Sequence, residues 1–343
     1  MRGEPRRIVL RAPNWVGDVI MATPALRALR ARFPQARIAV MAKGTGLAVL
    51  DGSPWFDDGI ERGRGFRENA RRLRAFGADA GVLLPNSHGS ALEMWLAGVP
   101  RRVGTDMNLR GLLLTDRVRP RMAGLRRDPT PMTRYYLDVV ALLGAASDDE
   151  RVELHTTAAG DAKAEAWLAE RGVTPDDRVV VVAPGAAFGP SKLWLPERWA
   201  AVADRLAAPR GWKILLSTAP DERALGAEVA AHCRAPVVNP DGASVGLRTI
   251  KSILARHAAI ALTTDSGARH VATGLGIASV VLMGPTHPGH TASNLERTTV
   301  VRQEGIECAP CHLKICPIDH RCMTRIDVDR VARAAEALIT AAG

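Results

Sequence analysis

The sequence predicts an α/β protein made of two doubly wound parallel-sheet domains. Short runs of aliphatic and β-branched residues alternate with longer stretches of helical periodicity, which is typical of successive βαβ units. Several of these runs are apolar at nearly every position, as are the strands of a parallel sheet that is covered on both faces. At 343 residues the chain is long enough for two domains, each with its own core.

The elements follow one another in two series. In the first series we expect strands at 7–11, 37–41 and 80–84 and helices at 18–32, 90–97 and 130–143. In the second series we expect strands at 178–183, 213–217, 259–263 and 279–283 and helices at 196–207, 222–232 and 328–342. The small, polar stretch at 145–150 separates the two series and is typical of a linker. We therefore place the domains at residues 1–150 and 151–343.

Composition indicates a globular protein with an uneven charge. Hydrophobic residues make up 47% and charged residues 24%, and no apolar run is long enough to span a bilayer. The arginine pair Arg6–Arg7 is followed by no apolar signal region, so we expect the protein in the cytoplasm and its five cysteines reduced. Residues 1–150 hold 24 Lys and Arg against 16 Asp and Glu. This excess indicates an anionic partner for the first domain, or merely a solvated arginine-rich surface.

Three turns at the carboxyl ends of predicted strands carry the candidate chemistry, because open α/β sheets bind ligands at that edge. Gly17 permits a tight turn after the first strand, and Asp18 stands where a helix begins. Asp18 is either the cap of that helix or a carboxylate able to act as a general base.

The other two turns lie in the second domain. Gly185 opens a glycine-rich turn that ends in Lys192, which is not a Walker A loop but places a lysine within reach of a phosphate, or else is a plain exposed loop. In the third turn Asp265 or Ser266 can cap the next helix, whose exposed amides would bind an anion. His270 follows one turn later, as a site residue or as an ordinary packed histidine.

Read together, these turns resemble the motifs of glycosyltransferase family 9. The resemblance rests on PNWVGDVIMATPALRAL from Pro13, PGAAFGPSKLW from Pro184 and DSGARHVA from Asp265, in matching order and separation. It covers essentially the whole chain and is strongest to the lipopolysaccharide heptosyltransferases of type II.

The resemblance implies a GT-B fold and an inverting transfer of L-glycero-D-manno-heptose from ADP-heptose to the lipopolysaccharide inner core. It implies that Asp18 is the general base and that Lys192 holds the diphosphate. The donor site implied on the C-terminal domain comprises Gly185, Ala186, Ser191, Lys192, Glu222, Asp265, Ser266, Gly267 and His270. Asp221 competes with Glu222 for the contact to the ribose. A lysine and helix-start amides supply fixed positive charge to a departing diphosphate, so no metal is expected in catalysis.

The N-terminal domain is expected to bind the acceptor, which is of the Kdo–lipid A type. The acceptor residues implied are Asn14, Trp15, Gly17 and Thr23, with Arg62, Arg64 and Arg67 as a basic patch for the anionic inner core. The alternative for the patch is a solvated helix face. We expect peripheral contact with the cytoplasmic face of the inner membrane and no nucleic-acid partner.

A cysteine cluster near the C-terminus is a separate feature. Cys308, Cys311, Cys316 and Cys322 have a spacing typical of a zinc or iron–sulfur site, with His312 or His320 able to replace one ligand. The alternative, which we favour, is that these residues are reduced thiols packed in a loop. A c-type haem attachment is disfavoured, since it requires export.

Two other classes of function remain open from the sequence. One is a GT-B transferase or epimerase that acts on another nucleotide sugar. The other is a metal or redox protein built on the cysteine cluster, with the two α/β halves as a scaffold.

Overall fold

The chain divides into two compact units. The computed structural model describes residues 3–120, 122–123, 126–127 and 129–341. The N-terminal unit comprises Met1–Leu154 and Gly289–Ser293, and the C-terminal unit comprises His155–Pro288 and Asn294–Gly343. The short segment Gly289–Ser293 is tied into its unit by the hydroxyl of Thr133, which donates to Ser293 Oγ over 3.0 Å.

The N-terminal unit is built on a parallel sheet in the order β3-β2-β1-β4-β5-β6. Its strands are β1 (Arg7–Arg11), β2 (Arg37–Ala42), β3 (Asp58–Glu61), β4 (Ala80–Leu83), β5 (Arg101–Thr105) and β6 (Asp116–Val118). Its helices are α1 (Val16–Met21), α2 (Thr23–Arg32), α3 (Gly44–Leu50), α4 (Phe66–Phe76), α5 (His88–Leu96), the 3-10 turn η1 (Arg110–Leu113) and α6 (Met132–Ala141). A separate antiparallel pair joins β7 (Met122–Ala123) to β8 (Arg126–Arg127).

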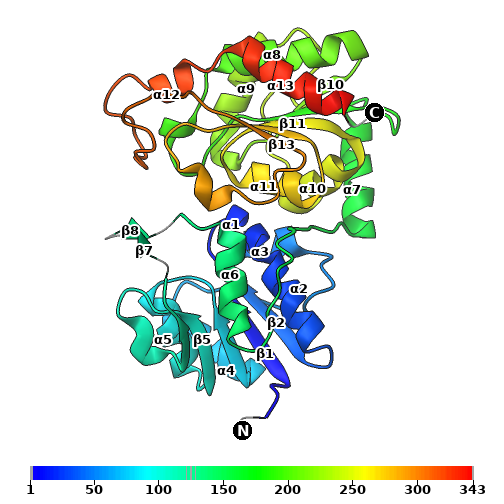
Figure 1. The fold of residues 1–343 in the computed structure, drawn as a ribbon. Coiled ribbons are helices and arrows are strands. Elements are labelled where there is room, and N and C mark those ends of the chain that lie inside the picture. The colour runs from blue at the N-terminus through cyan, green and yellow to red at the C-terminus, as the bar shows by residue number, and fades with distance from the viewer. Residues whose placement is uncertain (1–2, 121, 124–125, 128, 342–343) are drawn as a thin grey trace. The chain divides into compact units, whose positions relative to one another are not determined.

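Helices cover both faces of this sheet (Figure 1). On one face α4 packs beside α5, and on the other α2 packs beside α6. The central strand β1 is buried from Ile8 to Arg11, since a parallel strand covered on both faces has no solvent side. Successive side chains of β1 point to opposite faces, and Val9 belongs to the core beneath α4 and α5.

The helix that we expected at 18–32 is two helices. α1 ends at Met21, and α2 begins at Thr23 with Pro24 in its first turn. Pro24 has no N–H and its ring clashes with the carbonyl one turn earlier, so a continuous helix cannot pass through it. The Thr23 hydroxyl donates over 2.8 Å to the carbonyl of Ile20 that Pro24 leaves unpaired.

The C-terminal unit is built on a second parallel sheet, in the order β10-β9-β11-β12-β13. Its strands are β9 (Val179–Ala183), β10 (Lys213–Leu216), β11 (Ala258–Thr264), β12 (Ser279–Leu282) and β13 (Thr298–Val301). Its helices are α7 (Ala158–Ala169), α8 (Pro196–Ala207), α9 (Arg223–His232), α10 (Leu247–His257), α11 (Gly267–Gly274), α12 (Arg321–Thr324) and α13 (Val328–Thr340). Three 3-10 turns are also present: η2 (Pro190–Lys192), η3 (Ala208–Arg210) and η4 (Pro220–Glu222). A further 3-10 turn, η5 (Pro288–Thr291), begins at the last residue of this part of the C-terminal unit and lies otherwise in the segment Gly289–Ser293.

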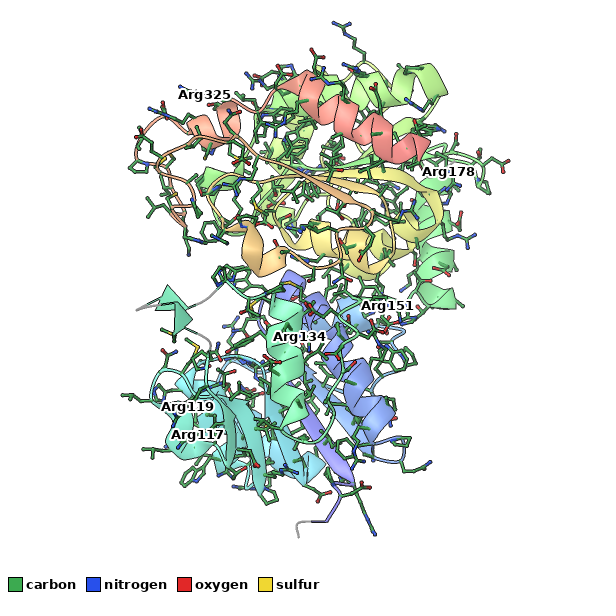
Figure 2. The ribbon with its side chains drawn as sticks, in the orientation of Figure 1. Arg117, Arg119, Arg134, Arg151, Arg178 and Arg325 are labelled. Atoms are coloured by element: carbon green, nitrogen blue, oxygen red, sulfur yellow. The ribbon has the colours of Figure 1, made fainter. Side chains whose placement is uncertain are left out.

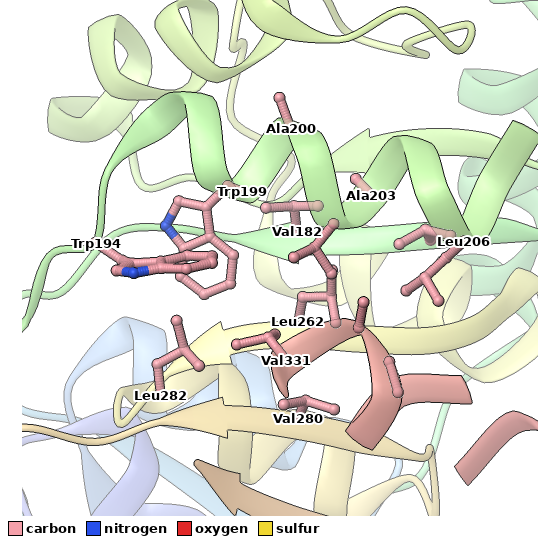
Figure 3. Close-up of a cluster of buried hydrophobic side chains, with 14 of the residues drawn as sticks. Val182, Trp194, Trp199, Ala200, Ala203, Leu206, Leu262, Val280, Leu282 and Val331 are labelled. Carbon is pink, nitrogen blue, oxygen red and sulfur yellow. The ribbon is translucent and has the colours of Figure 1, made fainter. Parts of the chain in front are cut away.

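One face of the second sheet carries α8, α9 and α13 over a tightly packed core (Figure 3). Trp194 and Trp199 meet edge to face at its border, with ring centroids 5.1 Å apart. Both rings are almost fully buried beside Leu282 and Val331. Edge-to-face packing adds about 0.5–1.5 kcal/mol to the stabilisation from burial. This core fixes the strands whose carboxyl ends carry the candidate site.

Within the part of the chain that the structure describes, no helix combines the length and the apolar character needed to cross a bilayer.

Candidate active site

Polar side chains of the C-terminal unit gather at the carboxyl edge of its sheet. Lys192 lies in η2, which follows β9, and Asp265 follows β11 directly. Thr286 comes from the loop after β12. Because parallel strands end at the same edge, residues far apart in sequence meet there.

A buried ion pair forms the centre of this group. Lys192 Nζ lies 2.9 Å from Asp265 Oδ2, and the two side chains are only 9% and 10% exposed. Lys192 also donates to the Asp265 carbonyl, and Thr286 donates to Asp265 Oδ2 over 2.7 Å. Arg269 lies 3.1 Å from the other carboxylate oxygen. Burial acts to raise the pKa of Asp265, but the charges of Lys192 and Arg269 outweigh it and hold that pKa far below its usual value.

Gly185 and Glu222 are in direct contact beside this ion pair. A Cβ added to Gly185 would lie 2.1–2.2 Å from the carboxylate of Glu222, so any larger residue at this position would force that carboxylate to move. The Gly185 carbonyl accepts a hydrogen bond of 2.6 Å from Thr264, and the Glu222 carboxylate accepts one of 2.9 Å from the Ala219 amide. Asp221 is exposed. The geometry favours Glu222 over Asp221 as the acidic residue at the site, and its contact with a nucleotide stays a prediction.

The third motif begins α11, but neither proposed cap is made. Ser266 occupies the cap position without a side-chain bond to the helix, and its hydroxyl lies 3.4 Å from that of Thr263. The Asp265 carboxylate pairs with Lys192 and Arg269 instead, so the Asp265 alternative was wrong, whereas Ser266 stands at the expected cap position without the side-chain bond. His270 is buried, and burial together with the charge of Arg269 lowers its pKa to about 3. His270 is therefore neutral at pH 7.

The turn that carries Lys192 is hydrogen-bonded to the cysteine-bearing loop. The Ser191 hydroxyl donates to the Leu313 carbonyl over 2.6 Å. Of the four clustered cysteines, Cys308 is exposed and Cys322 is buried. Within the described residues, no three His, Cys, Asp or Glu side chains are arranged to hold a metal ion. Whether the cysteines bind one stays a prediction.

In the N-terminal unit, Asp18 lies in the first turn of α1 and is not its cap. Trp15 holds the cap position, so the capping alternative was wrong for Asp18. Asp18 is half-buried, and the Trp15 ring beside it is 59% exposed. Gly17 is buried and Asn14 exposed. The Thr23 hydroxyl both donates a hydrogen bond to the Ile20 carbonyl and accepts one of 3.1 Å from the Glu153 amide.

A buried charge network connects the first motif to the basic patch. Arg11, at the end of β1, lies 3.4 Å from Glu93 on α5 and reaches Asn14 Oδ1 over 3.5 Å. Glu93 also accepts a hydrogen bond of 2.7 Å from Asn69 and lies 3.9 Å from Arg62. Arg62 is thereby brought to the loop that carries Asn14.

The remaining arginines of the patch are at the surface. Arg64 and Arg67 are exposed beside the start of α4. Arg117 and Arg119 are further exposed arginines of this unit, at its β6 edge (Figure 2).

The sequence interpretation missed Arg269 and Thr286 in one unit and Arg11 and Glu93 in the other. The rule that ligands bind beyond strand ends could have found Arg11, which follows the apolar run Ile8–Leu10 directly, and Thr286, which lies three residues after the run that ends at Met283. Glu93 gave no such signal, since it stands on a helix and its burial shows only in the folded chain.

Comparison with known proteins decides the family. Residues 66–321 match the sequence profile of glycosyltransferase family 9 (heptosyltransferase). The chain belongs to this family. It is also 30% identical over 316 residues to lipopolysaccharide heptosyltransferase 2 of Escherichia coli strain K12, a match that spans 86% of this chain and 88% of the relative.

Solved structures of family 9 proteins share the fold. The E. coli ADP-heptose lipopolysaccharide heptosyltransferase II structure superposes with a TM-score of 0.79 at 24% identity, covering 98% of this chain and 99% of that one. A family 9 glycosyltransferase from Veillonella parvula gives a TM-score of 0.82 at 23% identity, covering 98% and 97%. The predicted GT-B fold class is confirmed, and so is the prediction of a glycosyltransferase.

Proposed function

We propose that this enzyme transfers heptose from ADP-heptose to the inner core of lipopolysaccharide with inversion at the anomeric carbon. The observation that carries the proposal is the Lys192–Asp265 pair, a buried lysine held at the carboxyl edge of a parallel sheet in a chain of the heptosyltransferase family. Relatives that are 26–30% identical over most of their length bear the name heptosyltransferase 2.

In the C-terminal unit we assign the donor site to the three turns around Lys192. Its ammonium balances the negative charge that develops on the diphosphate as the bond between the anomeric carbon and the phosphate oxygen breaks. The backbone at Ala186 and Gly267 and the side chains of Ser266 and His270 complete the surroundings of the nucleotide sugar. Because protein groups supply this positive charge, transfer should proceed without an added divalent cation.

In the N-terminal unit we assign the acceptor site to the loop before α1. Asp18 takes the proton of the acceptor hydroxyl as the oxygen attacks the anomeric carbon, so the products are the glycoside, ADP and the protonated carboxyl. Arg62 and the exposed Arg64 and Arg67 face an acceptor rich in acidic sugars and phosphates.

We propose further that the N-terminal unit meets the cytoplasmic face of the inner membrane. Leu109, just before the turn η1, and Leu112, within it, are 88% and 93% exposed. The guanidinium of Arg117 lies close to Gly111 of the same turn. Apolar tips beside arginines suit the boundary of an anionic bilayer. The protein should co-sediment with phosphatidylglycerol vesicles and not with purely zwitterionic ones, and equal binding to both would contradict the assignment.

The test of the reaction is nucleotide release. The purified protein is incubated with ADP-heptose, with and without a heptosylated Kdo–lipid A acceptor, beside UDP-sugar and GDP-sugar controls. Acceptor-dependent release of ADP supports the proposal. Release only from another sugar nucleotide would keep the fold and overturn the substrate.

A further inference from the structure

Arg110 is a buried cation at the carboxyl edge of the N-terminal sheet. Its side chain is fully buried in η1, which lies in the loop that follows β5. Among the described residues, no carboxylate lies within ion-pair distance of its guanidinium. The Asp106 carboxylate, whose charge acts on Arg110, is paired with Arg117 over 3.2 Å instead. A guanidinium stays protonated even when it is buried, so this charge has no paired anion in the described part of the chain.

Neutral oxygens surround the Arg110 guanidinium. Its Nε donates to the Thr105 carbonyl over 2.8 Å, at the end of β5. Its Nη1 donates to the Pro85 carbonyl, and its Nη2 donates to Asn86 Oδ1 over 3.0 Å, both in the loop after β4. Burial lowers the pKa of Arg110, as expected for a charge that is solvated mainly by neutral groups. Arg110 therefore ties together the two loops that leave β4 and β5.

The side-chain amide of Asn86 has a fixed orientation. Because an arginine N–H can only donate, the atom of Asn86 that faces Arg110 must be the amide oxygen. The Tyr135 hydroxyl donates to the same oxygen over 2.9 Å. The Asn108 side chain donates to the Asn86 backbone carbonyl over 3.1 Å and holds the loop. The amide cannot flip without losing both donors, so Nδ2 points away from Arg110.

The amide nitrogen of Asn86 is left as a hydrogen-bond donor. Among the described residues Nδ2 has no hydrogen-bond partner, and the half-buried side chain leaves it open to solvent. Arg110 and Tyr135 both polarise the amide through its oxygen, which strengthens the N–H groups of Nδ2 as donors. Such a donor, with a buried positive charge behind it, favours an oxygen that carries negative charge.

Asn86 lies beside the loop that we assign to the acceptor. β4 pairs with β1 in the sheet, and Leu83 at the end of β4 lies opposite Arg11 at the end of β1. The loop after β1 leads into Asp18, and the loop after β4 carries Asn86. Ligands of open α/β sheets bind beyond this edge. Asn86 is therefore placed to contact the same molecule as the proposed base.

The backbone that brings Arg110 to this position is strained. Asn108 and Leu109 have φ of +55° and +60°. Asparagine tolerates this left-handed region, but for leucine it is unfavourable. Strained backbone persists where its surroundings hold it, and it is frequent at binding sites. The loop thus gives up stability to place an unpaired cation against Asn86.

We propose that Asn86 binds the acceptor by donating from Nδ2 to an anionic oxygen of a carboxylate or phosphate group. Arg110 is the positioning residue, since it holds the amide and supplies the positive charge behind it. The identity of the acceptor rests on the proposed function, whereas the orientation of the amide does not.

Asn86→Asp separates binding from structure. The aspartate keeps an oxygen for Arg110 and Tyr135 and adds the carboxylate that Arg110 lacks, so the thermal midpoint should stay unchanged or rise. The same change removes the donor and places a negative charge against the acceptor anion. The KM for the acceptor should therefore rise at least about tenfold, with little change in kcat or in the KM for ADP-heptose. The control is Gln35→Glu, which adds the same charge at an exposed position before β2 and should behave as the wild type.

Two acceptors distinguish the sources of the anion. Heptosylated Kdo–lipid A is compared with the same molecule after its phosphates have been removed. A rise in KM that persists without the phosphates assigns the contact to a carboxylate, and a rise seen only with them assigns it to a phosphate. An unchanged KM for both acceptors in Asn86→Asp would overturn the proposal. A fall in the thermal midpoint of this variant would also overturn it, because Arg110 would then not lack an anion.

Binding measurements keep the test independent of the reaction. If ADP-heptose releases no ADP with any acceptor, the proposed reaction fails, and calorimetric titration of heptosylated Kdo–lipid A in detergent decides the fate of the site. Weaker binding to Asn86→Asp than to the wild type and Gln35→Glu supports the Asn86 contact. Equal binding to all three proteins, or no binding to the wild type, refutes it.

Discussion

The buried charges around Asp265 make removal of the carboxylate more harmful to stability than removal of the lysine. Asp265 lies 2.9 Å from Lys192 and 3.1 Å from Arg269, so one anion compensates two cations. At an effective dielectric constant of about 20, each pair is worth about 5–6 kcal/mol of Coulomb energy before desolvation is counted. Asp265→Asn leaves both cations buried together and should cost about 3–5 kcal/mol, the usual penalty for breaking a buried pair.

Lys192→Met leaves the Asp265 carboxylate with one of its two cationic partners. Asp265 keeps Arg269 and the hydrogen bond from Thr286, so the loss should be only about 1–2 kcal/mol. Lys213→Met is the control, because its half-buried ion pair with Asp177 lies in the same unit and should contribute less than about 1 kcal/mol.

Urea unfolding at pH 7.5, followed by tryptophan fluorescence, gives the three free energies. Calorimetric titration with ADP completes the comparison. Lys192→Met should weaken ADP binding by about 10–150-fold, since a hydrogen bond to a charged group contributes about 1.5–3 kcal/mol. If Lys192→Met destabilised the protein as much as Asp265→Asn, the account of two cations sharing one carboxylate would be refuted.

Three further predictions follow from the site. Asp18→Asn should lower kcat by about 10²–10⁴ while ADP affinity in calorimetry stays unchanged, and near-native turnover would remove Asp18 as the base. The pKa of His270 is about 3 in the folded protein and about 6.5 in the unfolded chain, so the unfolded chain binds a proton first as the pH falls. The free energy of unfolding should therefore drop between pH 6.5 and 4, by up to about 1.4 kcal/mol per pH unit. His270→Gln should make that drop smaller in urea titrations. Gly185→Ala should displace the Glu222 carboxylate and break its bond to the Ala219 amide, lowering the thermal midpoint and ADP affinity, and the second substitution Glu222→Ala should restore most of the midpoint.

The buried strands could be predicted from the sequence because their apolar runs have one cause, burial on both faces. β1, β9 and β12 are of this kind and lie where expected. β3 and β13 could not be found in this way, since each has a mixed burial pattern and no continuous apolar run. Solvent on one side removes the continuous apolar run on which the prediction depends.

The candidate site was predictable where chemistry follows a strand end directly. Lys192 and Asp265 were found by that rule and by family resemblance, and the structure brings them into contact. The contact between the His320 ring nitrogen Nε2 and the Ser191 carbonyl was not predictable from the sequence, because it joins residues 129 apart through an irregular loop. Burial of Glu93 likewise depends on how α5 packs, which no local pattern records.

The position of Gly289–Ser293 in the chain delays the completion of the N-terminal unit during synthesis on the ribosome. The first compact unit runs to Leu154, yet its last piece begins 135 residues later. At a synthesis rate of 5–20 residues per second, the nascent N-terminal unit waits roughly 10 s for that piece. During this time most of the C-terminal unit emerges, and Thr133 has no Ser293 oxygen to bind. No single cut in the chain therefore releases both units whole, and a separately expressed N-terminal half needs residues 289–293 joined back to it by a linker.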